Sequence, residues 1–378
     1  MRMGLRADVA VVGGGPCGAM AAAVAARGAK VLLLERAPER RPVCAGIISL
    51  KALEELELPR RLVLSELRGA VFHGPDGIGV TLTAPEPKAV VVGRPALDRF
   101  LRERAAEAGV EVLWEAAVGW DGRELRTSGG ERMIPEVLIG ADGALSGVAR
   151  WAGLPGPEEI LVAFQAEVEA ELERADHVEL FLGREFAPGF FAWAVPAGNR
   201  VLVGLASTAG KKGIEYLRSL LRRHFPGARV LSLRAGLIPI GSPPRTSRGR
   251  VLLVGNAAAQ TKPLSGGGIY FGAMAARIAG ELAAAGRPAD YEGAWRAILW
   301  REIHFGLRAR KLFLSLSDAE LKKLLGFLSR REIQEFLVTE GDFDRHSELL
   351  RALRGRPDLW PLGMELLRAL GGLGRFLP

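Results

Sequence analysis

The sequence predicts an α/β protein with a Rossmann-type dinucleotide-binding domain, an inserted antiparallel β-sheet domain and a C-terminal helical region. Three observations lead to this fold class. A glycine-rich strand–helix–strand pattern lies between Asp8 and Glu35. Segments with alternating apolar residues and turn signals interrupt the chain after it. From Asp290 onward, apolar residues recur at helical spacing among many Arg, Lys and Glu residues.

The composition excludes several classes of protein. Of the 378 residues, 48% are hydrophobic and 25% are charged, as in a globular protein with a sizeable core. Two cysteines are too few for a disulfide framework, and together with the absence of a signal-peptide pattern they favour a cytoplasmic protein. The net charge of +8 comes from dispersed arginines without a nucleic-acid-binding motif, so we expect no nucleic acid partner. The scarcity of Asn and Gln is typical of thermophile proteins or of a biased genome.

The first strand and the turn after it predict a dinucleotide site. Val9 to Val12 is an apolar, β-branched run typical of a buried parallel strand. Three glycines follow at the spacing of the dinucleotide fingerprint: Gly13, Gly15 and Gly18. The first permits a tight turn, the second lets a pyrophosphate approach the backbone, and the third lets a helix pack on the strand.

The context of this turn favours a ligand over an empty glycine turn. Ala19 to Arg27 predicts a helix whose N-terminus points N–H groups and a partial positive charge at the phosphates. Val31 to Leu34 predicts the second strand, and Glu35 ends it where an acid accepts hydrogen bonds from a ribose. We expect Cys17, inside the turn, to be structural and to offer at most its backbone N–H to the ligand.

The next segments leave the parallel sheet and return to it. After Arg36, the loop from Arg40 to Ile48 has a small-residue centre, which would let a flat ring approach the backbone. Its Cys44 is either a small buried hydrophobe or a thiol beside a cofactor. We expect an amphipathic helix from Leu50 to Leu64, and antiparallel strands joined by a Pro-Asp-Gly turn between Leu67 and Val92.

The chain returns to the first domain at Gly93. A helix from Pro95 to Ala108 and a strand from Val110 to Trp114 are predicted. Arg94 at the helix entrance is either a solvated arginine or a partner of a phosphate or ribose. A further strand from Val137 to Ala141 ends at Asp142, which either accepts from a ligand hydroxyl or caps the following helix.

The last third contains a second glycine cluster. Residues 160–207 are predicted to be rich in strands and Ile214 to His224 to form a helix. Arg250 to Gly255 predicts a third buried parallel strand, and Asn256 to Ile269 then leads into a helix through Ala285. Three consecutive glycines at this junction, Gly266 to Gly268, imply a second approach of the backbone to the same ligand.

These signatures, in this order, resemble the flavin-dependent oxidoreductases typified by aromatic hydroxylases. Within that superfamily the chain is most similar to the archaeal geranylgeranyl reductase family. The similarity lies in Lys262 to Tyr270 (a flavin loop), Pro188-x-x-Phe191-x-Trp193-x-Val195-Pro196 (a lipid-cavity motif), Cys44 to Ile47 (a cysteine motif) and the helical extension from Tyr291 to Asp344. Asn256, Phe191 and Val195 depart from the usual Asp, Tyr and Phe.

The resemblance implies FAD as the cofactor and assigns residues to it. The expected cofactor-binding residues are Gly13, Gly15, Cys17, Gly18, Glu35, Arg36, Cys44, Ala45, Gly46, Arg94, Ala117, Asp142, Gly143, Asn256, Pro263, Gly266, Gly267, Gly268 and Ile269. Phe190, Phe191 and Trp193 are expected to contact the substrate, with ordinary core packing as the alternative. Cys44 is the candidate catalytic residue, and no metal is expected.

The implied activity is hydrogenation of isolated C=C bonds of geranylgeranyl or related isoprenoid chains in membrane-lipid biosynthesis. Because the chain has a single complete nucleotide fingerprint, we expect a transient electron donor: a ferredoxin, a deazaflavin or NAD(P)H. The basic and apolar segment from Leu307 to Phe313 favours peripheral membrane contact. The alternatives are an aromatic monooxygenase, a flavin halogenase, or a membrane-surface electron-transfer flavoprotein.

The expected domain boundaries follow these changes of pattern. Residues 1–66, 93–157 and 245–290 are predicted to form the discontinuous FAD-binding domain. Residues 67–92 and 158–244 are predicted to form the substrate domain, and residues 291–378 the helical domain.

Overall fold

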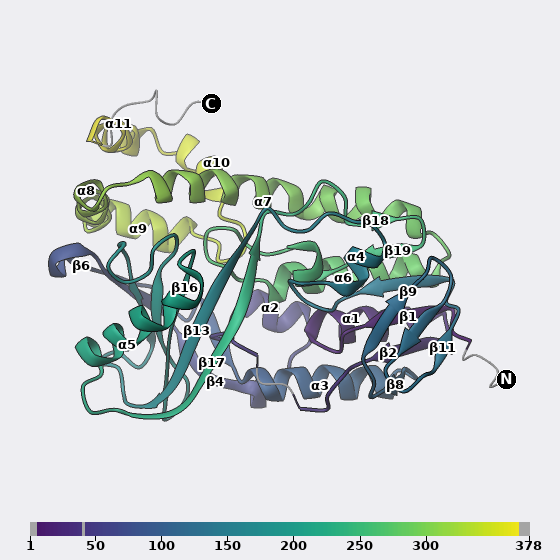
Figure 1. The fold of residues 1–378 in the computed structure, drawn as a ribbon. Helices are drawn as coiled ribbons and strands as arrows, with labels where there is room; N and C mark the ends of the chain where they lie inside the picture. The colour runs from purple at the N-terminus through teal and green to yellow at the C-terminus, as the bar shows by residue number, and fades with distance from the viewer. Residues whose placement is uncertain (1–5, 40–41, 370–378) are drawn as a thin grey trace. The chain divides into compact units, whose positions relative to one another are not determined.

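The computed structural model describes residues 6–39 and 42–369 (Figure 1). Arg40, Arg41 and residues 370–378 of the predicted helical region therefore lie outside the described residues. The chain divides into two compact units. The first consists of residues 1–42, 94–160 and 238–303, and the second of residues 43–93, 161–237 and 304–378. The division into three domains stays a prediction.

The first unit is built on a six-stranded sheet in the order β18-β19-β12-β1-β2-β8. Its neighbouring strands are parallel except at the β18 edge. The strands are β1 (Val9–Val12), β2 (Val31–Leu34), β8 (Glu111–Leu113), β12 (Val137–Gly140), β18 (Ser247–Arg248) and β19 (Val251–Leu253). The apolar runs form the buried strands because both faces of a parallel sheet are covered.

Helices cover this sheet, and small residues bring them close together. They are α1 (Pro16–Ala25), α3 (Arg94–Glu107), α4 (Gly147–Trp151), α6 (Ile269–Ala284) and the start of α7 (Tyr291–Ser315). Helix α1 packs against both α3 and α6 (Figure 1). A Cβ on Gly280 of α6 would lie 2.6 Å from the carbonyl oxygen of Ala21, so only glycine allows this approach.

A small antiparallel sheet is formed by β9 (Ala117–Trp120), β10 (Leu125–Thr127) and β11 (Arg132–Met133).

The second unit is built on a seven-stranded sheet in the order β17-β13-β16-β15-β14-β5-β6. Its strands are β5 (Gly69–His73), β6 (Gly79–Thr83), β13 (Glu159–Glu169), β14 (His177–Phe181), β15 (Ala192–Pro196), β16 (Val201–Ser207) and β17 (Arg229–Ile240). Except for the parallel β5–β14 pair, the pairings recorded within it are antiparallel. A three-stranded sheet joins β3 (Ile47–Ser49), β7 (Ala89–Val92) and β4 (Val63–Leu67).

Helices pack on the large sheet and form the end of the chain. They are α2 (Leu50–Glu55), α5 (Gly213–His224), α8 (Asp318–Leu328), α9 (Arg331–Glu340), α10 (Glu348–Arg354) and α11 (Trp360–Ala369). Helix α5 buries Leu217 and Leu220 in a core with Phe181 and Leu205, whereas α8 buries Leu321 and Leu325 with Val80 and Leu182. Short 3-10 helices lie at Arg60–Leu62, Pro75–Gly77, Gly210–Lys212, Gly255–Ala258, Pro288–Asp290 and Pro357–Leu359.

The predicted fold class is confirmed, with one wrong element. The helix expected from Leu50 to Leu64 ends at Glu55, a short 3-10 helix follows at Arg60–Leu62, and the last two residues of the range begin β4. Pro59 disfavours helix in the residue before it and cannot continue the helical hydrogen bonds, and β4 gains a partner in β7. Helix α1 begins three residues earlier than expected because Pro16 suits its first turn. No helix of the described residues is long and apolar enough to cross a bilayer.

Candidate cofactor and substrate sites

The turn after β1 is shaped so that only glycine fits at two positions. Gly13 has φ +104°, and a Cβ there would lie 2.4 Å from the carbonyl oxygen of Ala141. A Cβ on Gly18 would lie 1.8 Å from the carbonyl oxygen of Gly13. Gly15 precedes α1, and no side chain among the described residues caps that helix. The helix N-terminus is thus open to an anion, which fits the pyrophosphate of FAD.

A buried acid and a buried arginine hold this turn. Glu35, 3% exposed, accepts a hydrogen bond from Gly14 N at 2.8 Å. Arg102 of α3 donates to the carbonyl oxygens of Gly14, at 3.2 Å, and Pro38, at 2.8 Å. Glu35 and Arg102 therefore bind the two backbone groups of Gly14, and Arg102 also links this turn to the segment after β2. Arg102 is not among the residues predicted from the sequence, although Asp98 and Arg102, two charged residues four apart on an otherwise apolar helix face, were an available signal.

We expect Arg102→Met to weaken FAD binding. Methionine keeps the packing of the side chain but removes both hydrogen bonds, which we expect to cost about 2 kcal/mol, or roughly 30-fold in Kd. FAD titration of deflavinated protein measures the change. Arg99→Met, an exposed position of the same helix, is the matched control. Equal FAD affinity in the two variants would contradict a supporting role for Arg102.

Two predicted polar residues have partners within the first unit. The carboxylate of Asp142 accepts from Ser146 Oγ at 2.6 Å and from the N–H groups of Gly147, at 2.6 Å, and Val148, at 3.1 Å. The contacts at the start of α4 are those of the predicted helix cap, and the predicted contact of Asp142 with a ligand hydroxyl stays a prediction. Arg94 is not a solvated arginine, because its largely buried side chain donates to Asp98 at 2.9 Å.

The second glycine cluster forms a closed loop that leads into α6. Lys262 N donates to Gly267 O and Gly266 N donates to Lys262 O, each at 2.8 Å. Gly266 has φ +72°. Gly268 precedes α6, and a Cβ there would lie 3.2 Å from Asn256 Oδ1, so the amide of Asn256 lies at the start of this helix. Pro263 lies within the loop and Ile269 begins the helix.

Cys17 of the first glycine turn lies beside the two segments that the second glycine loop connects. A Cβ on Gly255, directly after β19, would lie 2.6 Å from Cys17 Sγ, and one on Gly272 of α6 would lie 2.4 Å from it. The first turn therefore packs against the end of β19 and the start of α6. That both glycine turns approach one ligand stays a prediction.

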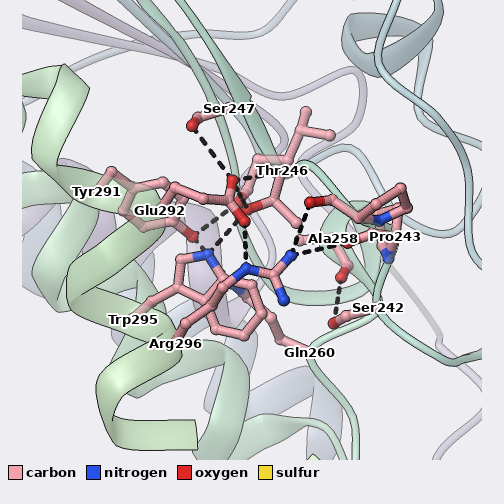
Figure 2. Close-up of polar contacts among 12 residues, drawn as sticks. Ser242, Pro243, Thr246, Ser247, Ala258, Gln260, Tyr291, Glu292, Trp295 and Arg296 are labelled. Atoms are coloured by element: carbon pink, nitrogen blue, oxygen red, sulfur yellow. Dashed lines mark hydrogen bonds and ion pairs between the residues drawn. The ribbon is translucent and has the colours of Figure 1, made fainter. Parts of the chain in front are cut away.

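A hydrogen-bonded network joins Gln260, which precedes the second glycine loop in sequence, to Tyr291 of α7 (Figure 2). Gln260 Oε1 accepts from Gly255 N at 2.8 Å, and its Nε2 donates to Tyr291 Oη at 3.0 Å. Tyr291 Oη in turn donates to Leu253 O at 2.7 Å. Ser242 Oγ lies 2.9 Å from the carbonyl oxygen of Ala258. Because these partners are buried, the network fixes the backbone that follows β19.

The first turns of α7 complete the network. Glu292 Oε2 accepts from Thr246 N at 2.8 Å, Thr246 Oγ1 at 2.9 Å and Ser247 Oγ at 3.2 Å, while Arg296 Nε donates to Oε1 at 2.6 Å (Figure 2). Trp295 Nε1 donates to Thr246 Oγ1 at 2.8 Å. The start of the predicted helical extension thus supports the first unit.

The two cysteines should differ in reactivity. Burial raises the pKa of the Cys17 thiol to about 12. Since a thiol reacts as its thiolate, which then forms only near and above that pH, we expect Cys17 to resist iodoacetamide at pH 8 in the folded protein and to react after denaturation. Peptide mass spectrometry measures both cysteines. Rapid modification of Cys17 in the folded protein would contradict its structural role.

The cysteine motif lies in the second unit. Gly46 has φ +75°, and a Cβ there would lie 2.2 Å from the carbonyl oxygen of Val92. Val92 N donates to Gly46 O at 2.9 Å, and Gly46 N donates to Cys44 Sγ at 3.3 Å. The half-buried Cys44 and Ala45 therefore form a tight turn that enters β3.

The predicted substrate residues form an aromatic row. The rings of Phe190 and Phe191 stack at 4.2 Å, and Phe191 meets Trp193 edge-on at 6.2 Å. Arg310 lies 5.3 Å from the ring centre of Phe190 and donates to Gly189 O at 2.9 Å. Phe191 packs beside the buried cluster that contains Leu325. These contacts include the core packing given as the alternative, and the substrate role stays a prediction.

The expected cofactor residues are divided between the units. Cys44, Ala45 and Gly46 belong to the second unit, and the others belong to the first. Of these, Arg36 is exposed, Ala117 begins β9, and Gly143 has φ +90° with open space at its Cβ position. Their contacts with FAD stay predictions. No group of three or more His, Cys, Asp or Glu within residues 6–39 and 42–369 is placed to hold a metal ion.

A parallel sheet with one glycine turn after β1 and a second glycine loop before α6 is the arrangement expected of an FAD-dependent oxidoreductase. A comparison of sequences gives the same class of protein. The model of the FAD binding domain family matches residues 6–218. Digeranylgeranylglycerophospholipid reductase of Methanothrix thermoacetophila is 33% identical over 370 residues, covering 88% of this chain and 93% of the relative. Digeranylgeranylglycerophospholipid reductase 2 of Methanothermobacter thermautotrophicus is 34% identical, covering 96% of this chain and all of the relative.

A solved structure extends the similarity to the whole fold. The geranylgeranyl bacteriochlorophyll reductase-like protein of Thermoplasma acidophilum superimposes with a TM-score of 0.82 and 25% identity, over 94% of this chain and 99% of that protein. The chain belongs to the archaeal geranylgeranyl reductase family of FAD-dependent oxidoreductases. The predicted family, cofactor and enzyme class are thereby confirmed.

Proposed function

We propose that this FAD-dependent reductase hydrogenates isolated C=C bonds of geranylgeranyl chains on archaeal-type membrane lipids. The observation that carries the proposal is the similarity to digeranylgeranylglycerophospholipid reductases over 88–96% of the chain. The departures at Phe191 and Val195 leave the choice among isoprenoid lipids to experiment.

The chemistry divides between cofactor and protein. FAD, when bound and reduced by the electron donor, would supply a hydride equivalent to one alkene carbon and return to its oxidised form. An isolated alkene is not polarised, so the contribution of the protein is to orient the substrate, exclude water and deliver a proton to the other carbon. Apolar aromatic side chains such as Phe191 and Trp193 suit the first two tasks.

Cys44 is the candidate proton donor. Its sulfur accepts the N–H of Gly46, which leaves its S–H free to point elsewhere. Cys44→Ser keeps a donor of similar size but of much lower acidity. We therefore expect this variant to turn over more slowly at equal FAD content. Unchanged turnover would return Cys44 to a packing role.

Product analysis tests the proposed activity. Purified protein is reduced under anaerobic conditions and mixed with digeranylgeranylglycerophospholipid, and the lipid is examined by mass spectrometry. We expect the lipid to gain two hydrogens for each bond reduced. A product that forms only with oxygen and gains an oxygen atom would instead establish a monooxygenase.

We further propose that the enzyme receives electrons from a transient donor and meets its lipid at a membrane surface. The donor is a ferredoxin, a deazaflavin or NAD(P)H, because the sequence has a single complete fingerprint. In the segment from Leu307 to Phe313, Arg310 and Phe313 pack within the second unit, as in an ordinary amphipathic helix. Trp360 and Met364 of α11 are instead exposed, and Arg354 lies on the preceding helix.

Vesicle sedimentation tests the membrane contact. We expect weak binding to anionic vesicles that decreases with added salt, because surface charges are screened over about 10 Å at 0.1 M salt. Neutral vesicles are the control. Equal recovery with neutral and anionic lipids at low salt would contradict the proposal.

A further inference from the structure

Three adjacent strands of the large sheet place a glutamine and a tryptophan in one row. Gln165 of β13 is opposite Gly204 of β16, and Gly204 is opposite Trp193 of β15. Side chains of directly opposite residues project from the same face of a sheet. The glutamine and the tryptophan are therefore separated only by a residue without a side chain.

The indole of Trp193 lies over this glycine. A Cβ on Gly204 would come within 2.7 Å of the indole atoms Nε1, Cε2 and Cζ2. Across the glycine, Trp193 Nε1 donates to Gln165 Oε1 at 3.2 Å. Gln165 is 5% exposed and Trp193 is 7% exposed, so this hydrogen bond is shielded from water.

The other end of the same amide reaches the cysteine motif. Gln165 Nε2 donates to the carbonyl oxygen of Cys44 at 3.4 Å. The thiol of Cys44 accepts from Gly46 N at 3.3 Å. A glutamine side chain can accept at one atom and donate from the other, which apolar residues of the same length cannot do.

We propose that Gln165 is a positioning residue that fixes the Cys44 turn and the Trp193 indole relative to each other. Its partners come from two motifs, 121 residues before it and 28 residues after it in the sequence. The bridge thus holds the candidate proton donor in a set orientation to the aromatic row. Its importance for alkene reduction rests on the proposed function, whereas the bridge itself does not.

Thiol reactivity tests the bridge without any lipid. In the FAD-loaded protein at pH 8, the rate of Cys44 alkylation by iodoacetamide is measured by peptide mass spectrometry. Gln165→Met keeps the length of the side chain and removes both hydrogen bonds. Releasing the carbonyl of Cys44 should raise the alkylation rate about two- to tenfold. An unchanged rate in a folded, FAD-loaded variant would overturn the proposal.

A second glutamine provides the matched control. Gln334 of α9 also donates to a backbone carbonyl, that of Thr81 at 3.3 Å, within the same unit. Gln334→Met should leave the alkylation rate of Cys44 unchanged. An equal rise in both variants would indicate general loosening and would overturn the specific bridge.

Trp193→Phe covers the case in which Gln165→Met fails to fold. Phenylalanine keeps an aromatic ring but cannot donate to Gln165, so the amide loses one anchor and Cys44 should again react faster. Where both single variants fold, their effects in the double variant should be less than multiplicative, because both act through one bridge. Fully multiplicative effects would overturn the coupling.

The lipid assay and the thiol assay separate the two proposals. If the lipid is not reduced but Gln165→Met still changes the alkylation rate of Cys44, the proposed reaction is rejected and the bridge is retained.

Discussion

Gly13→Val is expected to purify with almost no FAD. The new side chain would need the left-handed backbone of φ +104° and would place its Cβ 2.4 Å from the carbonyl oxygen of Ala141. Both demands displace the turn that we expect to face the pyrophosphate, and a valine costs more there than alanine because it is β-branched. The ratio of flavin to protein absorbance after purification measures the loss.

Gly109→Val separates loss of the ligand site from backbone strain. Gly109, between α3 and β8, has φ +92°, and nothing lies within 4 Å of its Cβ position. We expect this variant to be somewhat less stable but to retain FAD. Full flavin occupancy in Gly13→Val would contradict the placement of the cofactor at this turn.

Among substitutions in the network of Gln260 and Tyr291, we expect Gln260→Leu to lower the free energy of unfolding most. Gln260 and Tyr291 are both fully buried, and the leucine would leave Gly255 N without its acceptor and Tyr291 Oη without a donor. Two buried groups deprived of partners should cost about 3 kcal/mol, which corresponds to a fall in Tm of roughly 4 °C for a chain of this length. Thermal melts followed by circular dichroism and by flavin fluorescence measure the loss.

Gln334→Leu is the control for this substitution. Its amide is only partly buried and makes a single hydrogen bond to Thr81 O. We expect its Tm to fall by no more than about 1 °C. If Gln260→Leu melted at the same temperature as this control, the network in Figure 2 would not be what supports the flavin loop.

The sequence was informative where local pattern and tertiary structure agree. Strands β1 and β2 have the predicted bounds, because a short apolar run between turns has one favourable environment, the centre of a parallel sheet. The segment from Leu50 to Leu64 shows the opposite case. Its apolar spacing favours a helix throughout, but its last residues gain more by pairing with β7, a contact that no local pattern encodes.

The glycines of the candidate site could be predicted from the sequence, but the side chains that hold the site in place could not. Glycines at fixed spacing reflect backbone geometry that is local, so Gly13 and Gly18 could be identified from the chain alone. Arg102 meets Gly14 across 88 residues, and Gln165 meets Cys44 across 121. Such pairs are created only when distant strands and helices are assembled. Two roles could be predicted for Asp142 from its place in the sequence, and its contacts with α4 show one of them, the helix cap.

The central claim, that bound FAD transfers electrons to an isolated alkene, is tested most directly by anaerobic stopped-flow absorbance. The enzyme is first reduced and then mixed with digeranylgeranylglycerophospholipid or with the fully saturated lipid. We predict that the oxidised flavin spectrum returns with the unsaturated lipid alone. A flavin that stays reduced with both lipids and is reoxidised only by oxygen would contradict the account.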